Sequence, residues 1–191
     1  MTGKPYRLPE TAATGSRIDR SRQISFSFDG TRLTGFAGDT VASAILASGR
    51  KVMGRSFKYH RPRGLIGLGS EEMNALIGVG EGGRKEPNLR ATQVELYHGL
   101  TATSQNRWPS LDFDVGIINN KLSRFLPGGF YYKTFMWPRS FWEKVYEPFI
   151  RNAAGLGEAA REHDPDTYEQ MHVHVDVLVV GGGVSGIAAA Y

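Results

Sequence analysis

A glycine-rich turn near the end of the chain constrains the fold more than any other feature. Residues 175–180 are apolar except for Asp176, and they lead into Gly181, Gly183 and Gly186, which have the spacing G-x-G-x-x-G. Helix-forming residues follow at 187–190. A strand, a tight glycine turn and a helix are what a backbone needs to approach a pyrophosphate. The sequence therefore predicts that residues 172–191 begin a Rossmann-type dinucleotide-binding domain.

Each glycine of this turn has its own physical role. Gly181 permits the tight turn, Gly183 lacks a Cβ and so lets the main chain approach the phosphates, and Gly186 lets the helix pack on the strand. The helix N–H groups and dipole favour phosphate charge. A strand-to-helix turn without a ligand is the alternative. The predicted cofactor-binding residues are Gly181, Gly182, Gly183, Val184, Ser185 and Gly186.

The nucleotide site is incomplete within these residues. An acidic residue that binds a ribose hydroxyl is expected about 20 residues beyond the turn, but the chain ends at Tyr191. One strand and one short helix also cannot bury themselves. We therefore expect the chain to be the N-terminal piece of a longer protein, with two separately encoded pieces as the alternative. The piece alone is expected to be inactive.

A β-grasp domain is predicted ahead of the glycine turn, at residues 22–100. Ile24, Phe26 and Phe28 alternate with serines before Asp29-Gly30, a strong hairpin signal. Residues 38–52 predict a helix capped by Asp39 or Thr40, with Gly49 at its C-terminal end. Residues 74–79 and 92–96 predict further strands, whereas residues 81–90 predict turns.

The remaining segments predict an arm and a connector. Residues 1–21 are polar and basic, which predicts a flexible arm. Residues 101–171 form an aromatic-rich connector broken by prolines, with short helices predicted at 142–146 and 149–154. The predicted fold class is α/β (α+β): a ferredoxin-like β-grasp domain, an irregular connector, and the first strand and helix of a Rossmann-type domain.

Composition excludes several classes of protein. The chain has no cysteine, so it can hold no disulfide, thiolate zinc site or cysteine-ligated iron–sulfur cluster. It shows no signal-peptide pattern and no apolar run of about 18 residues, so we expect a cytoplasmic protein without a membrane partner. Residues 1–63 contain 12 Lys/Arg and 4 Asp/Glu. Without a nucleic-acid-binding motif, this basic half predicts a solvated surface or an acidic protein partner, not nucleic acid.

Other candidate sites carry weaker signals. The cationic stretch from Arg55 to Arg63 could clamp a flavin phosphate, dock an acidic partner or simply be solvated. His172 and His174 share a face if extended, but no third metal ligand is evident, so we predict no metal site. Nothing places an acid–base partner opposite Asp112 and Asp114, so no catalytic residue is assigned. Five aromatic residues predict packing more than a cofactor cavity: Tyr131, Tyr132, Phe135, Trp137 and Trp142.

Several stretches together resemble the N-terminal part of the α subunit of heterotetrameric sarcosine oxidases. They are, in order, GDTVASAILASG, GRSFKYHRPRG, RATQVELYHGL, SQNRWPSLDFDVG, GGFYYKTFMWP, YEPFIRNAAGLG and DVLVVGGGVSGIAAA. The resemblance runs from about residue 24 to residue 191. The second and fifth stretches are specific, whereas many flavin and nicotinamide enzymes share the glycine motif.

The resemblance implies a function within a complex. Such complexes oxidatively demethylate sarcosine to glycine with oxygen and release hydrogen peroxide, together with formaldehyde or 5,10-methylenetetrahydrofolate. FAD and FMN belong to the β subunit, NAD to the α subunit, and tetrahydrofolate to a C-terminal half of the α subunit that these residues do not include. The implied partners are β, γ and δ subunits, of which a small one carries zinc. This segment would support subunit assembly and begin the NAD site.

The first domain also resembles the [2Fe–2S] domain of related amine and opine oxidases. Those domains carry a C-x₄-C-x₂-C loop, and here the corresponding positions hold Ile66, Glu71 and Asn74. The resemblance implies that the scaffold is kept and the cluster is lost.

Two other functions remain open. One is a subunit of another flavin-linked amine, opine or proline oxidase, although those relatives usually keep the cluster loop. The other is a non-enzymatic docking module that recruits a flavoprotein. A folate-binding C-terminal half in the full-length sequence would favour sarcosine oxidase.

Overall fold

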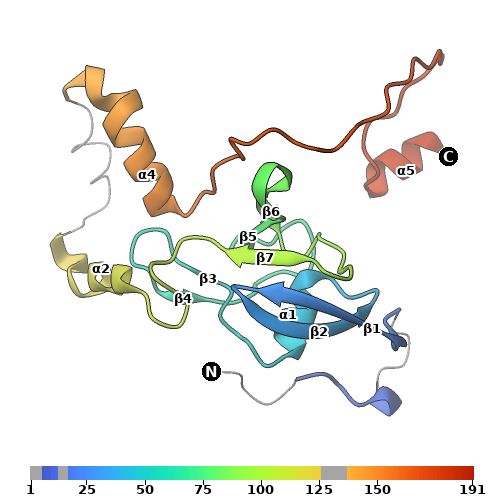
Figure 1. Ribbon diagram of the computed structural model, residues 1–191, viewed down its shortest axis with the longest axis horizontal. Helices are drawn as coiled ribbons and strands as arrows, with labels where there is room; N and C mark the ends of the chain where they lie inside the picture. The colour runs from blue at the N-terminus through green and yellow to red at the C-terminus, as the bar shows by residue number, and fades with distance from the viewer. Residues whose placement is uncertain (1–5, 13–16, 126–136) are drawn as a thin grey trace.

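The computed structural model describes residues 6–12, 17–125 and 137–191, and its centre is a five-stranded sheet (Figure 1). The strand order is β2-β1-β7-β5-β6, and β1 pairs with β7 in parallel while the other neighbours are antiparallel. The strands are β1 (Asp19–Phe28), β2 (Thr31–Ala37), β5 (Leu76–Val79), β6 (Glu86–Arg90) and β7 (Thr101–Ser104). Helix α1 (Val41–Ala47) packs on the sheet. The predicted β-grasp arrangement is thus confirmed.

Local signals produce the first hairpin and α1. Asp29 and Gly30 have φ values of 49° and 74°, the left-handed pair that a tight hairpin turn requires. At the start of α1, the Thr40 hydroxyl accepts from Ser43 N at 3.2 Å and the Ser43 hydroxyl accepts from Thr40 N at 3.0 Å. This capping box satisfies two amides that the helix leaves unpaired. Gly49 has φ 93°, as a left-handed residue after the helix does.

The core lies between α1 and the sheet. Side chains from α1, β1, β5 and the segment after α1 are fully buried there, including Phe28, Val41, Ile45, Met53 and Ile77. Val41, Ala44 and Ile45 are all 0% exposed, so they form the buried face of α1.

The predicted strand at residues 92–96 is wrong. In the structure this segment makes one isolated bridge, Thr40 to Glu95. Its backbone instead caps α1: Val94 O accepts from Val41 N and Asp39 O accepts from Leu96 N, both at 2.9 Å. The alternating pattern therefore reflects a segment that buries alternate side chains while its polar groups pair with the helix start.

Two further predictions about this part of the chain are also wrong. Residues 86–90, predicted as a turn, form β6, which tolerates Pro87 because it is an edge strand. The domain does not close near residue 100, because β7 lies between β1 and β5 at the centre of the sheet.

The described part of the predicted flexible arm docks on the domain. Tyr6 N donates to Ala47 O at 3.1 Å, and Arg7 forms a 2.6 Å ion pair with the buried Asp39 carboxylate. A short 3₁₀ helix, η1 (Glu10–Ala12), follows, and β1 begins at Asp19. One cation of the basic arm, Arg7, is thus paired with a carboxylate of its own chain. Residues 1–5 and 13–16 lie outside the described ranges.

Short helices dominate the rest of the chain. They are η2 (Gly82–Arg84), η3 (Val115–Ile117), α2 (Ile118–Lys121), η4 (Ser123–Phe125), η5 (Arg139–Phe141), the π-helical η6 (Trp142–Tyr146), α4 (Glu147–Ala154) and α5 (Val184–Ala190). The two helices predicted in the connector are confirmed by η6 and α4. No helix in the described ranges has both the length and the apolar character needed to cross a bilayer.

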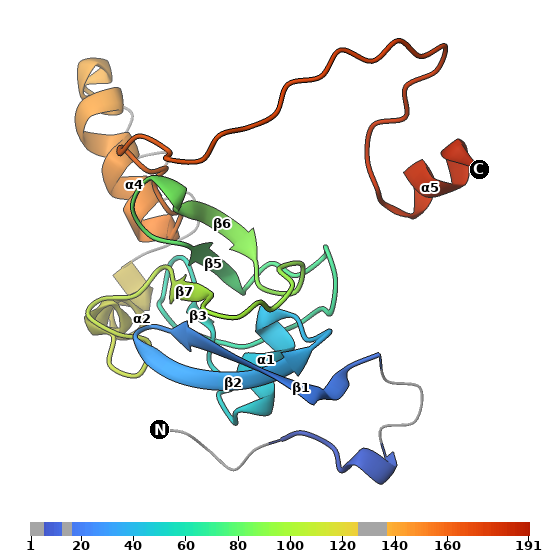
Figure 2. The ribbon, with the colours of Figure 1, turned by 45° about the vertical axis from the view of Figure 1, so that its right-hand side comes forward.

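Residues 175–180 form no strand, in contrast to the prediction (Figure 2). They run as an exposed extended segment, and only the following helix, α5, is formed. The physical reason is that a strand needs a partner for its N–H and C=O groups, and none of the described segments pairs with this one.

Candidate functional site

The cationic loop, residues 55–63, is an ordered hairpin. It connects the two-residue strands β3 (Gly54–Arg55) and β4 (Pro62–Arg63), which pair antiparallel. Ser56 N donates to Arg61 O at 2.9 Å, and His60 N donates to Ser56 O at 2.9 Å. The Ser56 hydroxyl also accepts from Arg61 N at 2.9 Å. These bonds fix the backbone from which the cationic side chains project.

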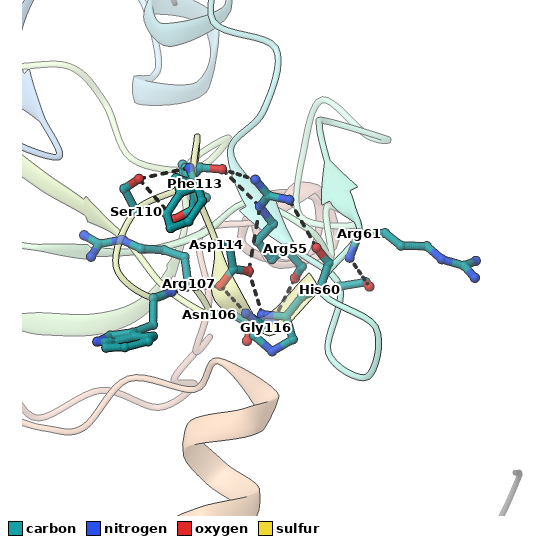
Figure 3. Close-up of polar contacts among 12 residues, drawn as sticks. Arg55, His60, Arg61, Asn106, Arg107, Ser110, Phe113, Asp114 and Gly116 are labelled. Carbon is teal, nitrogen blue, oxygen red and sulfur yellow. Dashed lines mark hydrogen bonds and ion pairs between the residues drawn. The ribbon is translucent and has the colours of Figure 1, made fainter. Parts of the chain in front are cut away.

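Asp114 anchors this loop from a distant part of the chain (Figure 3). Its side chain is 0% exposed and lies 2.7 Å from His60 Nδ1. Its other oxygen accepts from Trp108 N at 3.0 Å and from Gly116 N at 3.1 Å. A carboxylate oxygen only accepts, so Nδ1 carries the proton in the His60 pair.

Two further residues, Gly116 and Arg55, lie against the Asp114–His60 pair. A Cβ at Gly116 would collide with the His60 ring, so the ring requires a glycine there. The Arg55 guanidinium is 6% exposed, lies 3.9 Å from the Asp114 carboxylate, and donates to Leu111 O and His60 O. The Arg55 guanidinium is therefore used in contacts inside the fold, which argues against the hypothesis that it binds a flavin phosphate.

Two other cations of the loop, Lys58 and Arg61, flank the ring of Tyr59. Lys58 Nζ lies 5.3 Å and Arg61 Cζ lies 4.9 Å from the centroid of the Tyr59 ring. Arg61 Nε also donates to Asn120 Oδ1 at 2.7 Å. Arg61 and Arg63 are exposed, as is Phe57 at 40%. The outward side of the loop is thus a cationic and aromatic surface, suited to an anionic group or an acidic protein.

A small cavity of about 220 Å³ lies behind this loop. It is lined by residues of the loop, of the segment just after β7 and of the end of α4, among them Arg55, Arg63, Gln105 and Gly155. Asn106 Nδ2 donates to Arg55 O at 2.7 Å, while its Oδ1 is buried without a partner. The cavity therefore lies where the connector meets the domain.

At the predicted cofactor turn, Gly181 and Gly186 lie where a larger residue would be strained or would collide with the backbone. Gly181 has φ 113°, and a Cβ at Gly186 would collide with the Gly181 carbonyl oxygen. A Cβ at Gly182 or Gly183 would meet no atom within 4 Å. Gly183 is the N-terminal cap of α5, which begins with Val184 and Ser185. The open side at Gly183 fits the close backbone approach that a pyrophosphate needs.

The other predicted candidates are not brought together. His172 and His174 lie in an exposed segment, and no group of metal-ligating residues occurs in the described part of the chain. Trp137 and Trp142 are 83% and 47% exposed, and they line no buried aromatic cavity. Tyr131, Tyr132 and Phe135 lie outside the described residues.

The Asp114–His60 pair was not predicted from the sequence, and no partner was predicted for Asp112 or Asp114. Asp112 forms a surface ion pair with Arg50 at 3.1 Å, whereas Asp114 is the buried anchor. The available signal was Asp114 followed two residues later by Gly116, a pattern typical of an aspartate that caps its own turn.

Comparisons with known proteins show which proteins the chain is similar to. The family described as a 2Fe-2S iron-sulfur cluster binding domain matches residues 21–107. Sarcosine oxidase subunit alpha from Rhizobium meliloti (strain 1021) is 60% identical over 185 residues, which cover 97% of this chain and 18% of that protein. Its namesake from Corynebacterium sp. (strain U-96) is 35% identical over 190 residues, covering 98% of this chain and 15% of that protein.

A solved structure, the L-proline dehydrogenase from P. horikoshii, is similar with a TM-score of 0.37 and 21% identity, over 55% of this chain and 18% of that chain. The chain spans less than a fifth of the length of the curated relatives. Over that span, the chain is homologous to sarcosine oxidase alpha subunits.

Proposed function

We propose that this chain is part of the α subunit of a sarcosine oxidase. The observation that carries the proposal is the 60% identity across 97% of the chain. The complex would demethylate sarcosine to glycine with oxygen, giving hydrogen peroxide and formaldehyde, or 5,10-methylenetetrahydrofolate when tetrahydrofolate accepts the carbon. FAD and FMN would reside elsewhere in the complex, with β, γ and δ subunits as partners.

Within that complex the chain would have two roles. Gly181, Gly183 and Gly186 would form the phosphate-binding turn of the NAD site, because the backbone at Gly181 and Gly183 leaves open space there. A bound NAD would supply a hydride-transfer group. The cationic loop would dock an acidic surface of another subunit, because its backbone is fixed by Asp114 while Lys58 and Arg61 flank Tyr59.

Substrate choice tests the reaction. The intact protein, purified with the subunits that accompany it, is expected to consume oxygen and form hydrogen peroxide in equal amounts when sarcosine is added. Proline and an opine serve as comparison substrates. A higher kcat/KM for either comparison substrate would assign the chain to another amine oxidase, and no turnover with any of them would favour a docking module.

Charge reversal tests the docking role. The double variant Lys58→Glu/Arg61→Glu is expected to lose co-purifying subunits, because like charges at a desolvated contact repel. Arg32→Glu, an exposed cation on β2, is the matched control and should assemble normally. Normal assembly of the double variant, measured by size-exclusion chromatography, would contradict the docking role.

A further inference from the structure

The loop at residues 64–75, called here the carboxylate loop, lies within the region that matches the 2Fe-2S family. The chain contains no cysteine. No side chain of this loop can therefore bind iron through a thiolate, so the residues present do not fit a 2Fe–2S cluster.

A buried carboxylate lies at the centre of this loop instead. Glu72 is 1% exposed. Its Oε2 accepts from Ile66 N at 2.7 Å and from Gly67 N at 2.8 Å, and its Oε1 accepts from Asn74 N at 2.7 Å. Three amides from both ends of the loop therefore converge on one side chain.

The preceding residue of the loop, Glu71, also accepts hydrogen bonds from backbone amides, but it does so at the surface. Glu71 is exposed, and its Oε1 accepts from Leu68 N at 2.8 Å and from Gly69 N at 3.0 Å. The loop is also fixed from outside, since Arg90 Nε donates to Glu72 O at 3.0 Å and the Thr92 hydroxyl donates to Gly69 O at 2.7 Å.

Converging backbone amides form a concave site for an anion, and iron–sulfur sites use this device. In such a domain, the cluster sulfurs accept hydrogen bonds from the protein. Burial disfavours the charge of Glu72, but the amides of Asn74, Gly67 and Ile66 outweigh burial and hold its pKa below the ordinary 4.5. The carboxylate thus persists as an anion among these amides.

We propose that the Glu72 carboxylate takes the place of the iron–sulfur cluster as the anion that holds this loop closed. The domain then keeps its loop folded without metal. The proposal concerns the β-grasp domain alone and does not depend on the substrate of the complex.

Two matched variants of the intact protein test the proposal by hydrogen–deuterium exchange of the peptide that covers residues 64–75. Glu72→Gln must turn its NH₂ group toward either the Ile66 and Gly67 amides or the Asn74 amide, because the wild-type residue uses both oxygens. Exchange in this loop is expected to accelerate about tenfold or more, since a buried donor loses its acceptor.

Glu71→Gln is the control, because one oxygen accepts both bonds and a glutamine carbonyl can do the same. Its exchange should stay close to that of the wild type. Equal exchange in the two variants would overturn the proposal. If Glu72→Gln does not accumulate, Glu72→Asp decides: it keeps the charge but shortens the side chain, and wild-type exchange in that variant would also overturn the proposal.

A second measurement tests the absence of the cluster directly. The purified wild-type protein is incubated anaerobically with ferrous iron and sulfide, and its iron, its labile sulfide and its visible absorbance are measured after desalting. We expect neither metal nor absorbance above a buffer control. Two irons and two sulfides per chain, with faster exchange in the loop, would show that the carboxylate yields to a cluster.

Discussion

Asp114 shows how a single residue fixes the candidate docking surface. Its buried carboxylate contacts the His60 ring and the Trp108 and Gly116 amides, and it lies 3.9 Å from Arg55 Nε. The contact with His60 spans 54 positions of the chain. The loop and the connector thus share one buried acceptor.

Asp114→Asn is expected to lower the free energy of unfolding by about 2–4 kcal/mol, because the buried Arg55 loses its countercharge and an amide donor faces existing donors. Urea unfolding of the intact protein measures this change. Asp112→Asn is the control: it breaks a surface pair with a 58% exposed aspartate, which should cost at most about 1 kcal/mol. Equal effects of the two substitutions would contradict the role of Asp114 as anchor.

At the same scale, the sequence shows where the cationic loop lies but not which contacts fix its conformation. Arg55 to Arg63 are adjacent in the sequence, so their charge is visible there. Arg55 was grouped with the other cations, yet it is buried against Leu111 O and His60 O. Which cation turns inward depends on a carboxylate from a distant segment, and no local pattern encodes that choice.

At the scale of elements, α1 is defined by its own sequence and by a remote segment. Thr40→Ala removes the hydroxyl that accepts from Ser43 N, so it is expected to cost about 1 kcal/mol of stability. Thr40→Ser keeps the hydroxyl and should retain most of that energy. Chemical denaturation followed by far-UV circular dichroism measures both variants, and an equal loss in both would show that the methyl group, not the cap, stabilises the helix start.

The carboxylate loop gives a pH-dependent prediction. The folded-state pKa of Glu72 is lowered below 4.5, so its stabilising effect is complete above that pH and is lost as the pH falls through the folded-state pKa. The difference in melting temperature between the wild type and Glu72→Gln should therefore be large at pH 7 and shrink below pH 4.5. A difference that stays constant down to pH 3 would mean that the charge of Glu72 contributes nothing.

Elements with strong local signals were predictable, and those defined by pairing were not. The Asp29-Gly30 turn and the Thr40 cap each depend on two or three neighbouring residues. Strand β7, with the sequence TATS, is short and consists of small residues. It becomes a central strand only because it pairs with β1 and β5. Residues 175–180 show the converse, since an apolar pattern typical of a strand stays unpaired without a partner.

At the scale of the whole molecule, the glycine turn lies apart from the β-grasp domain (Figure 1). The segment that follows α4 first contacts β6 and its neighbourhood, through Gly157 N to Asn88 Oδ1 and the Arg84–Asp166 ion pair, and then extends away from the sheet to α5 (Figure 1). Val177, Leu178 and Val180 are between 75% and 86% exposed. Burying such a run is favourable by roughly 1.5–3 kcal/mol per side chain, so we expect this segment to pack in the assembled protein.

The last prediction follows from the open space around two adjacent glycines. A Cβ at Gly182 or Gly183 meets nothing within 4 Å, so neither Gly182→Ala nor Gly183→Ala should disturb the turn itself. If a pyrophosphate binds there, only the methyl group at position 183 blocks the close backbone approach. In the intact protein, Gly183→Ala should weaken NAD binding about tenfold or more, while Gly182→Ala should bind normally. Isothermal titration with NAD measures both, and equal affinities would show that the dinucleotide does not bind at this turn.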